Sequence, residues 1–223
     1  MLKITMIARQ AIVGLAALAL AATPLRAQLY DNGLPNGANG NEMTQWIQAE
    51  DFAFGAPTVL GAVRFWAMHS GGYQGSIFWQ IYGNNVAQPG TVLFSGSVNP
   101  TVTGYPGAGC CGLTGYQFDF LLPNIGLGSG TFWLALHNGP LTTTSREEFY
   151  WSTTNGNSTL TGREDNTPFG DDGWFNNRQE HAFQLYGQTD TVPEPASMAL
   201  LATGLVGLAG FGLRRRRSRK DPT

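Results

Sequence analysis

The sequence predicts an all-β protein, a jelly-roll-like antiparallel β-sandwich, from three observations. Short runs of alternating apolar and polar residues recur through the middle of the chain, separated by clusters of Gly, Pro and Asn. No segment between them keeps a helical period over three turns. Seven or more short strands in about 160 residues, with no helical layer, favour two packed antiparallel sheets.

The candidate strands follow in chain order. Five have clear alternation, and two are shorter: 58–68, 76–82, 91–98, 116–122 and 131–137, then 149–152 and 182–186. In the first, we expect these residues on one face: Val59, Val63, Phe65 and Ala67. The stretch 42–50 is a candidate for one short helical turn. Long loops at 99–115 and 153–180, without a Cys…Trp…Cys arrangement, favour a jelly roll over an immunoglobulin sandwich.

The N-terminus predicts a secretory signal peptide over residues 1–27. Lys3 and Arg9 form a basic region, and an apolar stretch follows from 11 to 22. Ala27 is a small residue before the expected cut. The apolar stretch is too short for a transmembrane helix, so the mature chain is expected to begin at Gln28.

The C-terminus predicts a single transmembrane helix with a basic stop. An apolar run over 196–213 follows the motif Pro193, Glu194 and Pro195. At about 1.5 Å per residue the run reaches about 27 Å, close to the thickness of a hydrocarbon core. The cluster Arg214, Arg215, Arg216 and Arg217 begins a basic segment over 214–220, which keeps that end cytoplasmic.

This order of Pro-Glu-Pro, apolar helix and arginine cluster closely resembles the PEP-CTERM sorting signal of Gram-negative bacteria, over residues 191–220. The resemblance implies export, cleavage near the motif by an exosortase, and delivery to the cell surface or extracellular matrix. It implies partnership with the exosortase and the export machinery, and an inner-membrane-anchored precursor. Such proteins often accompany exopolysaccharide and biofilm genes. The alternative is an ordinary membrane anchor that is never cleaved.

Removing both ends leaves a core domain over 28–190. It keeps four arginines and 13 acidic residues, a net charge of 4 − 13 = −9, and has no lysine. A domain this acidic repels phosphate backbones, which excludes nucleic acid as an expected partner. Short motifs in the core at 30–33, 49–52, 63–66 and 88–91 resemble the jelly-roll-like modules that often precede this tail. That second resemblance supports the fold and supplies no activity.

Cys110 and Cys111 are the only cysteines, and they are adjacent. In an oxidising compartment they are expected to close a vicinal disulfide, to pair with another chain, or to remain free thiols.

The remaining polar residues offer few candidates for catalysis or metal binding. His69, His137 and His181 each stand alone in sequence, which favours ordinary surface or strand-end histidines. No Gly-x-Ser-x-Gly motif is present, and no catalytic residue is assigned. The acidic loop holding Asp165, Asp171 and Asp172 is a weak calcium candidate, the only cofactor considered, with a solvated loop as the default.

Aromatic rings exposed on a sandwich can stack on sugars. Alternation places Trp66 and Trp133 opposite the apolar faces of their strands, and Tyr73 lies in a turn. These three are the candidate carbohydrate contacts, with core packing as the alternative. The function expected is a structural or exopolysaccharide-associated binding component of the cell surface or matrix, and not an enzyme. The alternative is a polysaccharide-active enzyme with a surface anchor.

Overall fold

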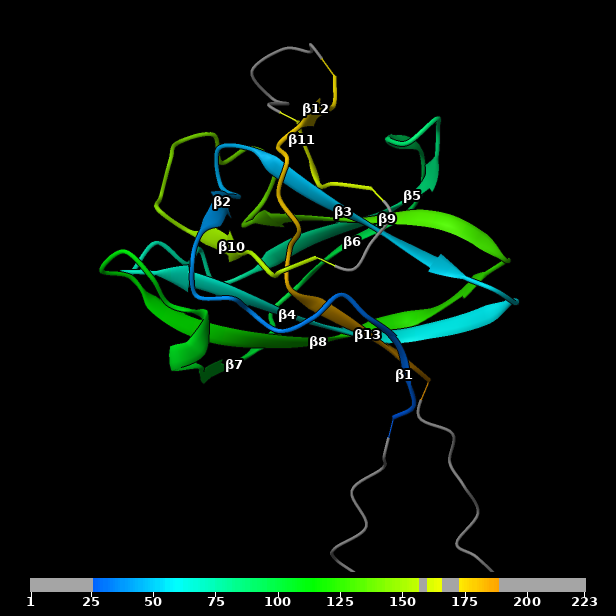
Figure 1. Cartoon of the computed structure of the whole chain (residues 1–223), viewed down its shortest axis with the longest axis horizontal. Coiled ribbons are helices and arrows are strands. Elements are labelled where there is room, and N and C mark those ends of the chain that lie inside the picture. Colours follow the sequence, from blue (N-terminus) through cyan, green and yellow to red (C-terminus); the bar gives the residue numbers. More distant parts are fainter. Residues whose placement is uncertain (1–25, 157–159, 166–172, 189–223) are drawn as a thin grey trace, which may run out of the picture. The chain divides into compact units, whose positions relative to one another are not determined.

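The computed structural model describes residues 26–156, 160–165 and 173–188, and they form two antiparallel β-sheets packed face to face. Figure 1 shows β3, β5 and β9 in one layer and β4, β8 and β13 in the other. The all-β, two-sheet prediction is confirmed. The transmembrane span, the sorting motif, the basic stop and nearly all of the signal peptide lie outside the described residues.

The first sheet has seven strands built around β4, Thr58–His69. On one side β4 pairs with β8, Thr114–Leu127, which pairs in turn with β7, Thr101–Gly104. On the other side β4 pairs with two strands along its length, each of which carries one further strand. These are β13 (Phe183–Gly187) with β1 (Gln28–Asp31), and β10 (Tyr150–Ser152) with β2 (Gly40–Glu42).

The second sheet has six strands in the order β12-β11-β3-β9-β5-β6. Their bounds are Phe175–Asn176, Arg163–Asp165, Ile47–Phe54, Gly130–Asn138, Ile77–Asn84 and Pro89–Val98. Every ladder between neighbouring strands is antiparallel.

The period-two pattern places the core as the sequence predicts. Along β8 the apolar residues at 116, 118, 120 and 122 face the opposite sheet, and along β5 those at 77, 79 and 81 do the same. Phe65 and Phe118 stack with ring centroids 4.9 Å apart at the centre. Fully burying each such ring contributes on the order of 2–3 kcal/mol, so the apolar residues between the sheets stabilise the domain.

For the strand predicted at 58–68, the first of the residues expected to face the core is wrong. Val59 is 44% exposed, and Leu60 takes the core position instead. The pairing of β4 with β8 shifts register between Leu60 and Ala62. This bulge inserts an extra residue and reverses the alternation on one side of it, which a strict period of two does not anticipate.

The predicted helical turn over 42–50 is also wrong. Glu42 ends β2, a bend follows, and Ile47 begins β3. The one helical element among the described residues is a short 3₁₀ turn, Pro106–Ala108. None of the described helical residues belongs to a segment long and apolar enough to cross a bilayer.

Loops bury part of each sheet's outer face. Over the second sheet, Trp133 and Ala135 pack with Ile47, Ala49 and Tyr82 beneath partly buried residues at 141, 160 and 174. Over the first sheet, Ala108 of the 3₁₀ turn and the preceding Tyr105 pack on Trp66 and Ala182. The domain therefore has apolar packing outside its two layers as well as between them.

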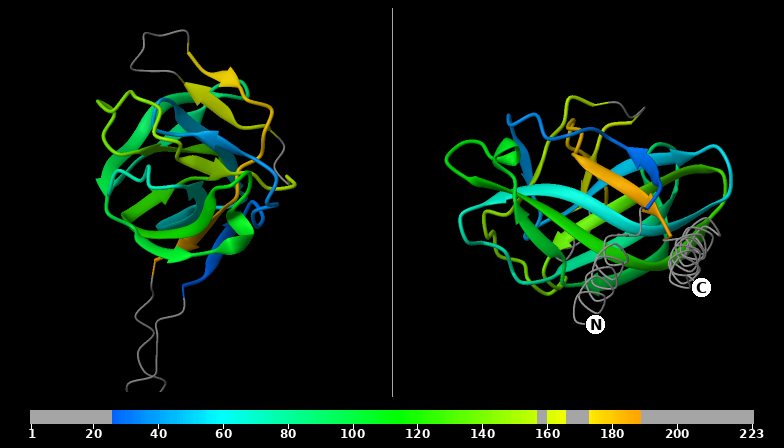
Figure 2. Two further views of the ribbon diagram at one scale, coloured as in Figure 1. Left: turned by 90° about the vertical axis from the view of Figure 1, so that its left-hand side faces the viewer. Right: turned by 90° about the horizontal axis from the view of Figure 1, so that it is seen from below.

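The two ends of the described domain lie side by side. Gly187 donates its backbone N–H to the carbonyl oxygen of Ala27 at 2.8 Å, next to the β1–β13 ladder. Figures 1 and 2 show β1 and β13 running together at one end of the domain. Strand β13 is interior, because it lies between β1 and β4.

Candidate functional site

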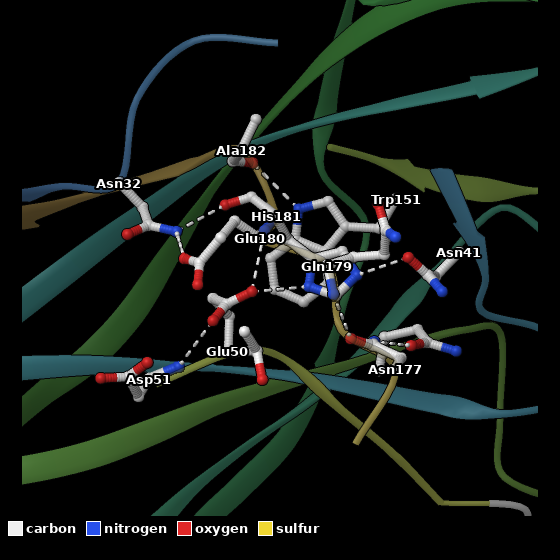
Figure 3. Close-up of polar contacts among 12 residues, drawn as sticks. Asn32, Asn41, Glu50, Asp51, Trp151, Asn177, Gln179, Glu180, His181 and Ala182 are labelled. Carbon is white, nitrogen blue, oxygen red and sulfur yellow. Dashed lines mark hydrogen bonds and ion pairs between the residues drawn. The ribbon is translucent and has the colours of Figure 1, made fainter. Parts of the chain in front are cut away.

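A buried pair of ionisable side chains lies between the sheets, Glu50 on β3 and His181 just before β13 (Figure 3). Both side chains are 0% exposed. The backbone N–H of His181 donates to Glu50 Oε2 at 2.8 Å, and the ring Nδ1 lies 2.8 Å from the same oxygen. The pair joins residues 131 positions apart, so it ties the second sheet to the last strand of the first.

The environment favours the uncharged form of both groups. Burial, followed by the charges of Glu180 and Asp51, raises the pKa of Glu50 well above its ordinary value. Burial lowers the pKa of His181 to about 3. Although the two atoms are close enough for an ion pair, both shifts favour the uncharged forms, because burial penalises the charged form of each group.

The contact of the other ring nitrogen agrees with this assignment. His181 Nε2 lies 3.1 Å from Oδ1 of Asn41, on β2. If Nε2 carries the proton and donates to that oxygen, Nδ1 is an acceptor. The proton in the short contact then belongs to Glu50, whose carboxylic acid donates to Nδ1.

Further hydrogen bonds hold the pair from the side of β1. The side chain of Asn32 donates to the carbonyl oxygen of His181 at 2.9 Å and, at 3.5 Å, to Glu180. Its own oxygen accepts from the hydroxyl of Tyr30 at 3.1 Å. Burial and the nearby carboxylates of Asp51, Glu50, Glu180 and Asp31 raise the pKa of Tyr30, so the tyrosine stays protonated.

The pair is also closed on its remaining sides. Trp151 packs on the imidazole with ring centroids 4.7 Å apart, and its indole N–H donates to the carbonyl of Ala182 at 2.9 Å (Figure 3). Gly162 lies directly on the pair: a Cβ built there would be 2.7 Å from the ring and 2.9 Å from Glu50 Oε2. Neither group meets solvent, so the arrangement connects the sheets and does not present a base to a substrate.

The structure buries all three histidines, which corrects the surface assignment. His137 is 0% exposed, with its ring nitrogens near the carbonyl oxygens of Gly139 and Thr44. His69 is 9% exposed and stacks on Tyr116. No sequence signal linked His181 to Glu50, because the contact depends on the long-range pairing of strands.

Two of the three predicted carbohydrate contacts are not surface rings. Trp66 is 1% exposed and Trp133 is 0% exposed, because loops cover the outer faces of their strands. Trp133 donates its indole N–H to Asn84 at 3.0 Å and lies under the guanidinium of Arg163. Tyr73 is half-buried against Phe118 and Phe149. The prediction of exposed rings at 66 and 133 is therefore wrong.

The structure does contain an open hollow with a partly exposed ring beside the second sheet. It has a volume of about 610 Å³. Trp174 lines it together with amide, hydroxyl and apolar groups from the β5–β6 hairpin. The ring of Trp174 meets Tyr82 edge to face at 5.4 Å, which fixes its position. The lining residues are Gly83, Asn84, Asn85, Pro89, Gly90, Thr91, Leu93 and Trp174.

The cysteine pair lies in the loop that follows the 3₁₀ turn. The sulfur atoms of Cys110 and Cys111 are 2.6 Å apart, with Cys111 exposed and Cys110 partly buried. Desolvation and the neighbouring thiol raise the pKa of Cys110 to about 11. Cys111 has a φ of 58°, in the left-handed region that non-glycine residues seldom adopt.

Two of the three candidate calcium ligands lie outside the residues that the structure describes. Asp165 ends β11 opposite Ile47, while Asp171 and Asp172 lie outside the described residues. Within the described ranges, no group of three or more His, Cys, Asp or Glu side chains is placed to hold a metal ion. The calcium prediction stays a prediction.

Comparison with known proteins identifies the C-terminal segment. Residues 191–217 match the family model described as PEP-CTERM protein-sorting motif. Neither the curated proteins nor the solved structures gave a significant match to this chain.

The molecule is therefore an all-β domain followed by a C-terminal sorting signal. The chain carries the PEP-CTERM protein-sorting motif at residues 191–217, and this motif implies processing by an exosortase. The motif implies an exported protein of Gram-negative bacteria.

Proposed function

We propose that the mature protein is a non-catalytic structural or binding component of the cell surface or extracellular matrix. The sorting motif at residues 191–217 carries this proposal, because an exosortase substrate is exported and processed at its tail. The proposal includes a signal peptide over 1–27, a jelly-roll form of the sandwich, and a membrane span over 196–213 that holds the precursor.

The buried polar pair supports a binding role over a catalytic one. The pKa of Glu50 is raised and that of His181 is lowered by burial, and both side chains are fully enclosed. General acid–base catalysis needs such groups within hydrogen-bonding reach of a substrate. Their enclosure favours a structural use.

Intact mass of the protein recovered from the native cell surface tests the sorting step. We expect a mass that lacks residues 1–27 and everything beyond the Pro-Glu-Pro region. Glu194→Ala should leave the tail uncut, while the control Glu148→Ala, on the exposed surface of the domain, should be processed normally. A mature mass that retains Arg214 to Thr223 would overturn the proposal in favour of an uncleaved anchor.

We further propose that extracellular polysaccharide, if it is the partner, contacts the hollow beside Trp174. An aromatic ring with nearby amide and hydroxyl groups, as Asn84, Asn85 and Thr91 provide, suits a neutral sugar face and its hydroxyls. Trp174→Ala should abolish binding to exopolysaccharide from the native strain. Phe175→Ala, which removes the adjacent exposed ring, should leave it intact. Equal binding by both variants and the unmodified protein would contradict this site.

A further inference from the structure

The free edge of the second sheet is an exposed strand without charge. Strand β6 is the terminal strand of that sheet and pairs only with β5 in the part of the chain that the structure describes. It carries three exposed apolar side chains: Val92 at 43%, Leu93 at 43% and Phe94 at 39%. An edge strand of this kind presents unpaired backbone N–H and C=O groups to any strand that approaches it.

Proteins usually protect such an edge with lysine, proline, a bulge or a very short strand. Strand β6 begins at Pro89, and its pairing with β5 shifts register twice between Pro89 and Phe94. From Phe94 to Val98 the strand has no charge and no proline, and its pairing is regular, so this half of the edge is unprotected. The opposite edge of the same sheet is protected, because β12 has two residues and its neighbour β11 contains Arg163, Glu164 and Asp165. The two edges of one sheet are thus built differently.

The uncharged character extends well beyond the strand. No Asp, Glu, Lys or Arg occurs anywhere from Phe65 to Phe118, a range that includes β5, β6 and β7. The core domain as a whole has a net charge of −9. Two copies of an acidic domain repel one another over most of their surfaces, and no charged side chain of β5, β6 or β7 adds to that repulsion.

We propose that β6 is a self-association surface on which a second copy of this chain pairs antiparallel, edge to edge. A strand that meets its own copy about a two-fold axis forms an isologous contact, which uses the same surface on both partners. The second sheets of the two copies then join into one continuous sheet. Because the opposite edge is protected, association stops at a dimer.

Sedimentation of the mature protein recovered from its native surface tests this, at concentrations from about 1 to 100 μM. The buffer contains a reductant, so that an intermolecular bond through Cys110 or Cys111 cannot hold the copies together. We expect a concentration-dependent monomer–dimer equilibrium that strengthens as salt is raised, because salt screens the repulsion between the acidic domains. A contact held by salt bridges would respond in the opposite direction.

The matched variants are Ser95→Lys, on the exposed face of β6, and Thr142→Lys, on an exposed loop after β9. Each adds the same charge outside the core. Ser95→Lys should raise the dissociation constant at least about tenfold, while Thr142→Lys should change it little. Hydrogen exchange at the amides of Thr91 to Val98 should slow on dimer formation in the unmodified protein and in Thr142→Lys, and much less in Ser95→Lys at the same concentration.

Three results would overturn the proposal. They are a monomer throughout the concentration range, a dimer weakened equally by Ser95→Lys and Thr142→Lys, and a dimer that disappears on reduction. Thermal unfolding of both variants in the same buffer shows whether the domain remains folded. If Ser95→Lys unfolds, Ser97→Lys, at another exposed position of β6, takes its place with the same expected result.

Discussion

Glu50 Oε2 receives the backbone N–H of His181 and also touches the ring Nδ1 of that residue, both at 2.8 Å. A single carboxyl oxygen thereby joins β3 in one sheet to the segment that enters β13 in the other. Because burial favours the uncharged form of both groups, the stability of the domain has a defined dependence on pH.

Replacing Glu50 with Gln should reduce the loss of stability that accompanies ionisation of this buried carboxyl as pH rises. The folded-state pKa of Glu50 is raised above its unfolded value, so its contribution is complete at low pH and is lost as pH rises through the folded pKa. As pH rises above the ordinary carboxyl pKa of 4.5, the unmodified protein should lose stability, and Glu50→Gln should lose less. Urea titrations across this range measure it, with the exposed Glu148→Gln as the control. Parallel slopes for Glu50→Gln and the unmodified protein would rule out the protonated acid.

Replacing His181 with Gln should affect the acid side instead. The pKa of His181 is lowered to about 3 in the folded state, so its contribution is present above about pH 6.5 and is lost as pH falls toward 3. For a fully buried group the loss is on the order of 3–5 kcal/mol. His181→Gln should be less stable at pH 7 but show a shallower decline from pH 6.5 to 4. A decline as steep as that of the unmodified protein would contradict the assignment.

Gly162 should tolerate no side chain. A Cβ there would lie within 2.9 Å of both Glu50 and His181, so Gly162→Ala must displace the pair. We expect a loss of about 1–3 kcal/mol in the free energy of unfolding. Gly126→Ala is the control, because a Cβ at that position in β8 has no atom within 4 Å and should change stability by less than about 0.5 kcal/mol. Equal effects of the two substitutions would show that the close approach at Gly162 relaxes freely.

The adjacent cysteines should be joined within one chain after export. Their sulfur atoms are 2.6 Å apart and Cys111 is exposed to an oxidising compartment. We expect the exported protein to resist alkylation until a reductant is added and then to gain two labels. Mass spectrometry counts the labels, and a nonreducing gel is the control. Disulfide-linked dimers on that gel would favour the intermolecular alternative.

The sequence predicted most of the strands because the inner faces obey a period of two. Tyr116, Phe118 and Phe120 of β8 all face the core as expected. The outer faces were not predictable in this way, because loops distant in sequence cover them. Alternation correctly put Trp66 and Trp133 opposite the core between the sheets, but it could not show that the 3₁₀ turn and the residues near 141, 160 and 174 bury them.

The sorting motif and the Glu50–His181 pair also differ in whether sequence alone could predict them. The sorting motif is local in sequence, so its residues could be recognised directly and the family model confirms them. Glu50 and His181 carry no local signature, since their contact depends on β3 pairing in one sheet and β13 in the other. A buried carboxylic acid beside histidine becomes visible only when that topology is known.

The position of β13 makes closure of the first sheet depend on the last residues of the domain. This interior strand, between β1 and β4, consists of Phe183–Gly187, among the last residues before the sorting tail. The first sheet cannot close, and His181 cannot reach Glu50, until the chain as far as Gly187 is available to fold. A domain truncated before β13 would leave a gap one strand wide between β1 and β4.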